Sequence, residues 1–161
     1  MGSSSGVAPV PSWLNTILHA PLALESKFIA AGADQNYKIR PEQLDAAITA
    51  KTKWVVLNSP SNPTGAVYSK EMVEAMVDIA RRHDLVVLTD EIYEKILFDD
   101  AVHHHAAAAA GNDVLCLTFS GLSKAYRVCG YRAGWVMISG PKELATDFLE
   151  GLTLIANMRM C

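Results

Sequence analysis

The chain lacks the features that mark several common classes of protein. Its 161 residues carry 14 Lys and Arg against 17 Asp and Glu, a net charge of −3, so no basic surplus favours nucleic acid as a partner. No apolar run approaches the ~20 residues that a membrane-spanning helix needs. The three cysteines, Cys116, Cys129 and Cys161, form no C-x-x-C pair. Together these absences predict a cytoplasmic protein with reduced thiols and neither a nucleic-acid nor a membrane partner.

Familiar nucleotide and nucleophile motifs are also missing. There is no G-x-x-x-x-G-K-[ST] phosphate loop. The segment Gly121-Leu122-Ser123-Lys124-Ala125 lacks the final glycine of a nucleophile elbow, and Ser120 to Lys124 is one residue too long for S-x-x-K. The sequence therefore does not favour P-loop phosphate transfer or serine hydrolysis.

Short apolar runs alternate with helical patterns along the chain. Four runs predict strands: 54–57, 85–88, 114–119 and 135–138. The middle runs are apolar at successive positions, which is typical of strands buried on both faces of a parallel sheet. Three patterns predict helices, at 70–83 with Ser69 as N-cap, from Pro41, and from Pro141 to about Met158; residues 14–30 predict a further one. This alternation predicts a doubly wound α/β domain with a mostly parallel sheet.

Polar residues follow the predicted strands at their carboxyl ends. Asn58, Asp90 and Ser120 fall at the ends of three of these runs. Because ligands of such sheets bind beyond the carboxyl ends of the strands, we expect these residues at one ligand-binding rim.

Asp90 admits two interpretations. A carboxylate in a dry crevice needs a charged partner, which points to a bound cation. Alternatively, Asp90 caps a helix that begins at Glu91, in which case Tyr93 would share a helical face with it. The residues alone leave both open.

Two other segments have a simple structural interpretation beside the functional one. Ser59 to Gly65 reads as a turn, because Pro, Asn, Ser and Gly dominate turns. His103, His104 and His105, followed by five alanines, favour an exposed loop leading into a short helix over a metal site. We therefore predict no metal centre.

Four motifs occur in a fixed order: Asn58-Ser-Pro-Ser-Asn-Pro-Thr-Gly65, Leu85-Val-Val-Leu-Thr-Asp-Glu-Ile-Tyr93, Phe119-Ser-Gly-Leu-Ser-Lys124 and Gly130-Tyr-Arg-Ala-Gly-Trp135. This set resembles the pyridoxal-phosphate-dependent aminotransferases of classes I and II, the fold-type-I group. The resemblance runs from Val7 to Cys161. It implies the large-domain core of that fold, the cofactor pyridoxal 5'-phosphate, amino acid and 2-oxo acid substrates, and a homo-oligomer.

The resemblance also implies roles for particular residues. Lys124 would form a Schiff base with the cofactor and then carry the proton, while Asp90 would pair with the pyridine nitrogen. Asn62 and Tyr93 would bind the phenolic oxygen, and Trp13 would stack on the ring. The implied phosphate-binding residues are Ser120, Ser123 and Arg132; a guanidinium suits a bidentate grip on phosphate.

Members of the family are more than twice as long as this chain. This difference in length predicts that residues 7–161 are a partial large domain without the small domain, which makes turnover by the chain itself doubtful. Residues 1–6, rich in Gly and Ser, look like a leader or tag-like segment. Two alternatives stay open: a pyridoxal-phosphate-dependent β-lyase and a non-catalytic α/β fragment or engineered core. The part from residues 31–37 through 68–69 resembles the bacterial aspartate and aromatic branch. Residues 121–140, with 150–152 and 156–159, resemble the alanine branch, so the sequence does not select the amino acid.

Overall fold

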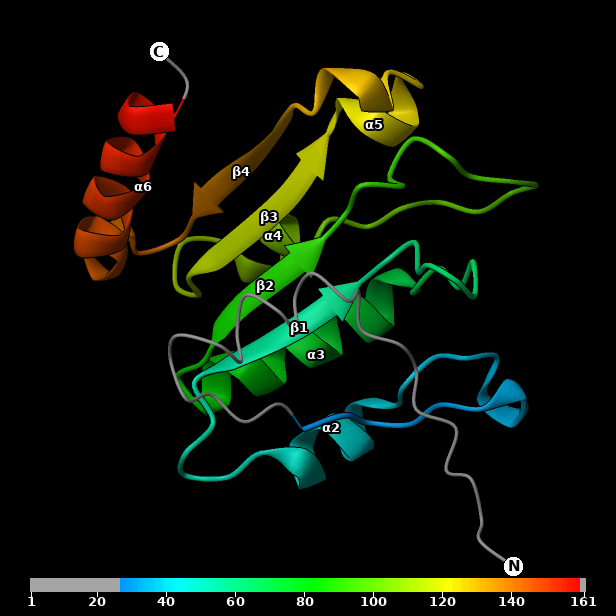
Figure 1. The fold of residues 1–161 in the computed structure, drawn as a ribbon. Helices are drawn as coiled ribbons and strands as arrows, with labels where there is room; N and C mark the ends of the chain where they lie inside the picture. Colours follow the sequence, from blue (N-terminus) through cyan, green and yellow to red (C-terminus); the bar gives the residue numbers. More distant parts are fainter. Residues whose placement is uncertain (1–26, 160–161) are drawn as a thin grey trace, which may run out of the picture.

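The sheet forms the centre of the computed structural model, which describes residues 27–159 (Figure 1). Its strand order is β1-β2-β3-β4. The strands are β1 Trp54–Asn58, β2 Val86–Asp90, β3 Cys116–Gly121 and β4 Gly134–Ser139. Strands β1, β2 and β3 are parallel and β4 runs antiparallel to β3. The four predicted strands and the mostly parallel α/β architecture are confirmed, with strand ends displaced by one or two residues.

Among the described residues, helices cover one face of the sheet, and the other face meets only the start of α6. The helices on one face are α2 Pro41–Ala47, α3 Lys70–Arg82 and α4 Ala106–Ala110, and their core includes Val55, Leu57, Val77, Val87 and Cys116. A smaller apolar cluster with Leu88, Leu117, Ala145 and Leu149 joins the opposite face to the start of α6, Thr146–Arg159. Within residues 27–159, no helix has the length and apolarity required to cross a bilayer.

The prediction for α3 is confirmed in detail. The Ser69 hydroxyl accepts a hydrogen bond from the amide of Met72 at 3.4 Å, which satisfies one of the unpaired N–H groups at the helix start. Met76 and Val77 are fully buried on the face that meets the sheet. At the other end, Arg81 donates to the Ala109 carbonyl at 3.1 Å and to the Asp113 carboxylate at 2.7 Å, which ties α3 to α4.

Three helix predictions need correction. After Pro141 the chain forms a 3₁₀ turn, η3 Lys142–Ala145, before α6 begins, because the amide of Leu144 donates to the Pro141 carbonyl in a tighter i→i+3 bond. Residues 27–30 are not helical, and residues 14–26 of that predicted helix lie outside the described part of the chain.

No helix follows Asp90 either. The amide of Glu91 donates to the Phe119 carbonyl at 2.9 Å, so the backbone still pairs with β3 at this point and then enters a series of turns. Asp90 is therefore not a helix cap, and Tyr93 lies in a turn rather than on a shared helical face.

Candidate active site

The strand register brings the predicted rim together. Asn58 lies opposite Asp90 across β1 and β2, and Asp90 lies opposite Phe119 across β2 and β3. Lys124 follows on α5, Leu122–Ala125, directly beyond β3. In Figure 1, the ends of the three parallel strands and α5 lie at the same edge of the molecule. The predicted placement of the polar strand ends at one rim is confirmed.

Tyr93 lies near both Asn62, on the loop after β1, and Lys124, on α5. Asn62 Nδ2 donates to the Tyr93 hydroxyl at 3.2 Å. Lys124 Nζ lies 5.6 Å from the centroid of the Tyr93 ring, within range of a cation–π interaction. Tyr93 therefore links the loop after β1 to the residue after β3.

The loop that carries Asn62 is closed on itself. The Ser61 amide donates to the Ala66 carbonyl at 2.9 Å, and the Gly65 amide donates to the Ser61 carbonyl at 2.8 Å. The Ser59-Pro60 and Asn62-Pro63 peptide bonds are cis. The predicted turn is thus confirmed, and it presents the Asn62 amide toward Tyr93. At the base of the loop, Asn58 Oδ1 is buried without a hydrogen-bond partner among the described residues.

Asp90 lies half-buried at the end of β2. Its Oδ1 accepts a hydrogen bond from the Ile92 amide at 3.2 Å. Burial raises the pKa of Asp90, the bond from Ile92 lowers it in part, and the neighbouring charge of Glu91 raises it further. A carboxylate in this environment would gain from a cationic partner.

A close approach between backbones shapes the rim beside Lys124. Gly121 lies opposite Gly134 across β3 and β4. A Cβ added to Gly121 would lie 3.0 Å from both the Ala133 carbonyl oxygen and the Gly134 Cα. Glycine here lets the segment after α5 pass close to the start of that helix.

In the described part of the chain, the structure does not join the predicted phosphate-binding residues by hydrogen bonds. Ser120 Oγ donates to Glu94 Oε1 at 3.5 Å, and Ser123 is half-buried on α5. Arg132 is exposed, with its Nη1 bonded to the Cys129 carbonyl at 3.0 Å. No hydrogen bond within residues 27–159 joins Arg132 to either serine, and their phosphate role stays a prediction. Trp13 lies outside the described residues.

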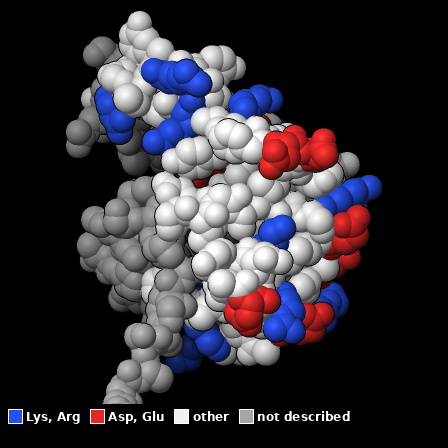
Figure 2. All heavy atoms as spheres, turned by 90° about the vertical axis from the view of Figure 1, so that its right-hand side faces the viewer, with Lys and Arg blue, Asp and Glu red and all other residues white. Residues whose placement is uncertain are grey.

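The rim has a cationic region. Lys124, Arg127 and Arg132 are all exposed on α5 and the segment after it. Figure 2 views the molecule from the rim side and shows Lys and Arg side chains gathered at the top of that face. An anionic group bound here would meet favourable charge.

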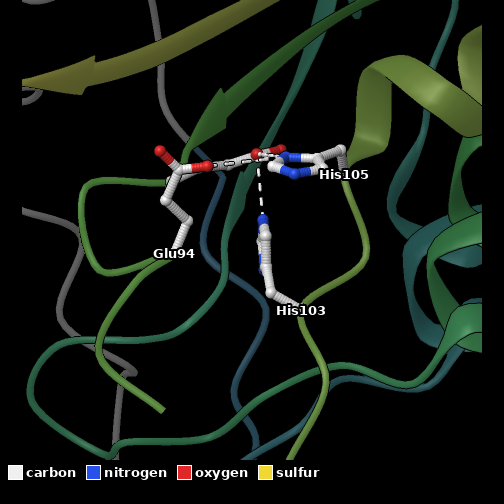
Figure 3. A group of neighbouring side chains, drawn as sticks. Glu94, His103 and His105 are labelled. Carbon is white, nitrogen blue, oxygen red and sulfur yellow. Dashed lines mark hydrogen bonds and ion pairs between the residues drawn. The ribbon is translucent and has the colours of Figure 1, made fainter.

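A cluster beside the rim was not predicted from the sequence. Glu91, 1% exposed, accepts hydrogen bonds at Oε2 from His103 Nε2 at 2.9 Å and from His105 Nδ1 at 2.5 Å. Figure 3 shows the rings of His103 and His105 close to each other, with the Glu94 side chain opposite His105. The predicted short helix after the histidines is confirmed, but the exposed loop is wrong for His103, whose side chain is only 5% exposed. Strand alternation was the available signal, because Glu91 continues the buried face of Val87 and Thr89.

Comparison with known proteins assigns the family. Residues 7–159 match the family model of class I and II aminotransferases. The alanine aminotransferase of Mycobacterium tuberculosis (strain H37Rv) is 53% identical over 149 residues, which are 88% of this chain and 34% of that protein. The glutamate-pyruvate aminotransferase AlaA of Escherichia coli K12 is 52% identical over 74% of this chain and 29% of its own length. A crystal structure of an Escherichia coli aminotransferase superposes with a TM-score of 0.76 at 48% identity, covering 81% of this chain and 32% of that one. This chain thus spans about a third of the length of its relatives, and it belongs to the class I and II aminotransferase family.

Proposed function

We propose that this chain is the cofactor-binding part of a pyridoxal-phosphate-dependent aminotransferase that moves an amino group from an alanine- or aspartate-like amino acid to a 2-oxo acid. The contact of Lys124 with Tyr93, which in turn bonds Asn62, carries this proposal. The names of the relatives include alanine, glutamate-pyruvate and aspartate aminotransferases. We further propose that residues 7–161 form part of the large domain, and that the protein is a cytoplasmic homo-oligomer.

The residues at the rim fit the chemistry of this cofactor. When bound, pyridoxal phosphate acts as an electron sink that stabilises negative charge on the substrate's α-carbon. The half-buried Asp90 carboxylate, whose pKa is raised by burial, suits a protonated ring nitrogen. The Tyr93 hydroxyl and the Asn62 amide are donors for the phenolic oxygen. Arg132, Ser120 and Ser123 would hold the phosphate, with the exposed cationic region of α5 adding favourable charge.

Each side chain then has a defined task. Lys124 Nζ would supply the amine that holds the cofactor, and as a free amine it would act as the base and acid that carries the proton. The Tyr93 ring beside Lys124 limits the positions that this amine can occupy. Asp90 would keep a proton on the ring nitrogen by charge pairing, since an ion pair in a partly dry site favours both charged forms.

Covalent trapping tests the proposal directly. The chain is mixed with pyridoxal phosphate, reduced with borohydride and digested, and the mass adduct is assigned to a peptide. We expect the adduct on Lys124 and its loss in Lys124→Ala, with Lys142→Ala, an exposed lysine on η3, as the matched control. An adduct spread evenly over surface lysines, or unchanged in Lys124→Ala, would refute the assignment.

The reaction type needs a separate assay. We expect repeated turnover of an amino acid to its 2-oxo acid only when a second 2-oxo acid is present as acceptor, with alanine, aspartate and glutamate as donors; without the acceptor, no more 2-oxo acid forms than there is bound cofactor. Release of ammonia and pyruvate, without any 2-oxo acid acceptor, from an amino acid that carries a leaving group on its β-carbon would assign a β-lyase instead. Because the chain spans about a third of its relatives, cofactor trapping and turnover are measured independently.

A further inference from the structure

Glu91 is a buried carboxylate with every hydrogen-bonding direction used. Oε1 accepts from the Thr89 hydroxyl at 3.1 Å and from the Ala106 amide at 3.1 Å. Oε2 accepts from His103 and His105. An ionised carboxylate with only 1% of its side chain exposed is stable in a protein only with such compensation. The proposed reaction uses none of these groups.

These bonds close the loop between β2 and α4 at its root. Thr89 is the penultimate residue of β2, His103 and His105 end the loop, and Ala106 begins α4. The loop's first turns carry Tyr93 and Glu94, and Asp90 directly precedes it. Glu91 therefore joins the two ends of the segment that presents Tyr93 to Asn62 and Lys124.

The pleat separates Glu91 from the rim. Thr89 and Glu91 point to the face covered by α3 and α4, while Asp90 lies between them on the other face. Fixing the Glu91 side chain on one face consequently fixes the backbone from which Asp90 projects on the other. A contact of this kind acts on the site through the backbone and does not touch a ligand.

The distances between the side chains of this cluster fit hydrogen bonds better than shared ligation of a metal ion. The ligand atoms of Glu91, Glu94, His103 and His105 lie within 4.8 Å of one another. However, the nitrogen–oxygen distances of 2.9 and 2.5 Å are hydrogen-bond lengths, whereas two ligands of one tetrahedral zinc ion, each about 2.0–2.2 Å from it, lie more than about 3 Å apart. Glu91 Oε1 is also already occupied by Thr89 and Ala106.

We infer that Glu91, clamped by His103 and His105, is a positioning residue that holds the first turns of the 91–105 loop, and with them Tyr93 and Asp90, in place at the rim. The ordering of the loop stands independently of any cofactor. Its effect on cofactor binding rests on the proposed function.

Hydrogen exchange of the cofactor-free chain tests the ordering. Amides of residues 91–97 and 103–108 are compared in the unsubstituted protein, Glu91→Gln and His105→Gln, with His104→Gln as the matched control on the same loop. We expect exchange in these segments to rise about tenfold or more in Glu91→Gln, less in His105→Gln, and to stay unchanged in His104→Gln and in peptides of β1. The milder His105→Gln, at a half-exposed side chain (47%), provides the test if Glu91→Gln does not fold. Unchanged exchange in the loop of the folded variants would overturn the inference.

Cofactor titration distinguishes this inference from the proposed function. If the unsubstituted protein forms the Lys124 adduct, we expect Glu91→Gln to weaken pyridoxal phosphate binding about tenfold and to shift the pH dependence of its visible band, while His104→Gln does neither. Equal binding and an equal band would overturn the positioning role. If the unsubstituted protein forms no adduct, the proposed function fails and the exchange data still decide the ordering. Zinc binding by the unsubstituted protein that is lost in both His103→Gln and Glu91→Gln would overturn the clamp in favour of a metal site.

Discussion

Asp90 and Glu91 are neighbours in the chain, but their pKa values shift in opposite directions. Burial raises the pKa of Asp90, and the one hydrogen bond from Ile92 offsets this only partly. Burial also acts to raise the pKa of Glu91, but hydrogen bonds from His103, His105 and Ala106 outweigh it, so that pKa is lowered. Strand alternation directs the two carboxylates to opposite faces of the sheet. Hydrogen bonds within the fold therefore compensate the buried charge of Glu91, whereas the charge of Asp90 is only partly compensated and would be stabilised by a cation.

We expect Asp90→Asn to stabilise the cofactor-free protein at neutral pH by about 0.5–1 kcal/mol, because a half-buried anion is replaced by a neutral amide that still accepts from Ile92. Since the pKa of Asp90 is raised by folding, its contribution to stability decreases as the pH rises through the folded value. Urea unfolding at pH 7 measures the change, with the exposed Asp100→Asn as control. The same variant should bind pyridoxal phosphate about tenfold more weakly. A less stable Asp90→Asn would contradict the proposed uncompensated charge.

The pH dependence of stability should show the opposite sign for Glu91. Its pKa is lowered in the folded state, so its stabilisation is present above the unfolded pKa of about 4.3 and is lost as the pH falls through the folded value. The difference in unfolding free energy between the unsubstituted protein and Glu91→Gln should therefore shrink as the pH is lowered from 7 to 3. Denaturant titrations at several pH values measure it, with the exposed Glu150→Gln as control. A difference that is constant over this range would show that Glu91 is not ionised in the fold.

The thiols of Cys116 and Cys129 should react at different rates. Burial raises the pKa of Cys116 to about 11 and its side chain is fully enclosed, whereas Cys129 is exposed. Only the thiolate attacks alkylating reagents, so we expect Cys129 to be labelled about 100-fold faster or more in the native state. Peptide mapping after brief iodoacetamide treatment measures both sites at once, and denatured protein provides the reference. Comparable native rates would mean that β3 is not buried as described.

Two glycines near β4 should differ in their tolerance of alanine. Gly140 has a φ of 89°, in the region that favours glycine, and an added Cβ would collide with the Val114 carbonyl. Gly130→Ala is the matched control, because nothing lies within 4 Å of a Cβ there. We expect Gly140→Ala to destabilise the fold by about 2–3 kcal/mol and Gly130→Ala by less than about 1 kcal/mol. Chemical denaturation decides between them, and equal values would refute the positive φ of Gly140 and its close approach to Val114.

Local patterns predicted much of the fold. The apolar runs of β1 to β4, the Ser69 cap and the proline at the start of α2 depend on nearest neighbours in the chain, and each is found in the structure. The helix expected after Asp90 failed because the Glu91 amide pairs with Phe119 instead, and such a long-range bond leaves no local signal.

The sequence by itself determined the family, the alternation of strands and helices, and the placement of Asn62, Asp90 and Lys124 at or just after strand ends. Strand ends and turn residues are local properties of the chain. Only the tertiary structure decided which of these side chains meet. Tyr93 meets both Asn62 and Lys124 because the sheet register brings the segments that follow β1, β2 and β3 together. Likewise, Glu91 pairs with His103 and His105 because the chain returns to the same sheet face, and no spacing in the sequence encodes that return.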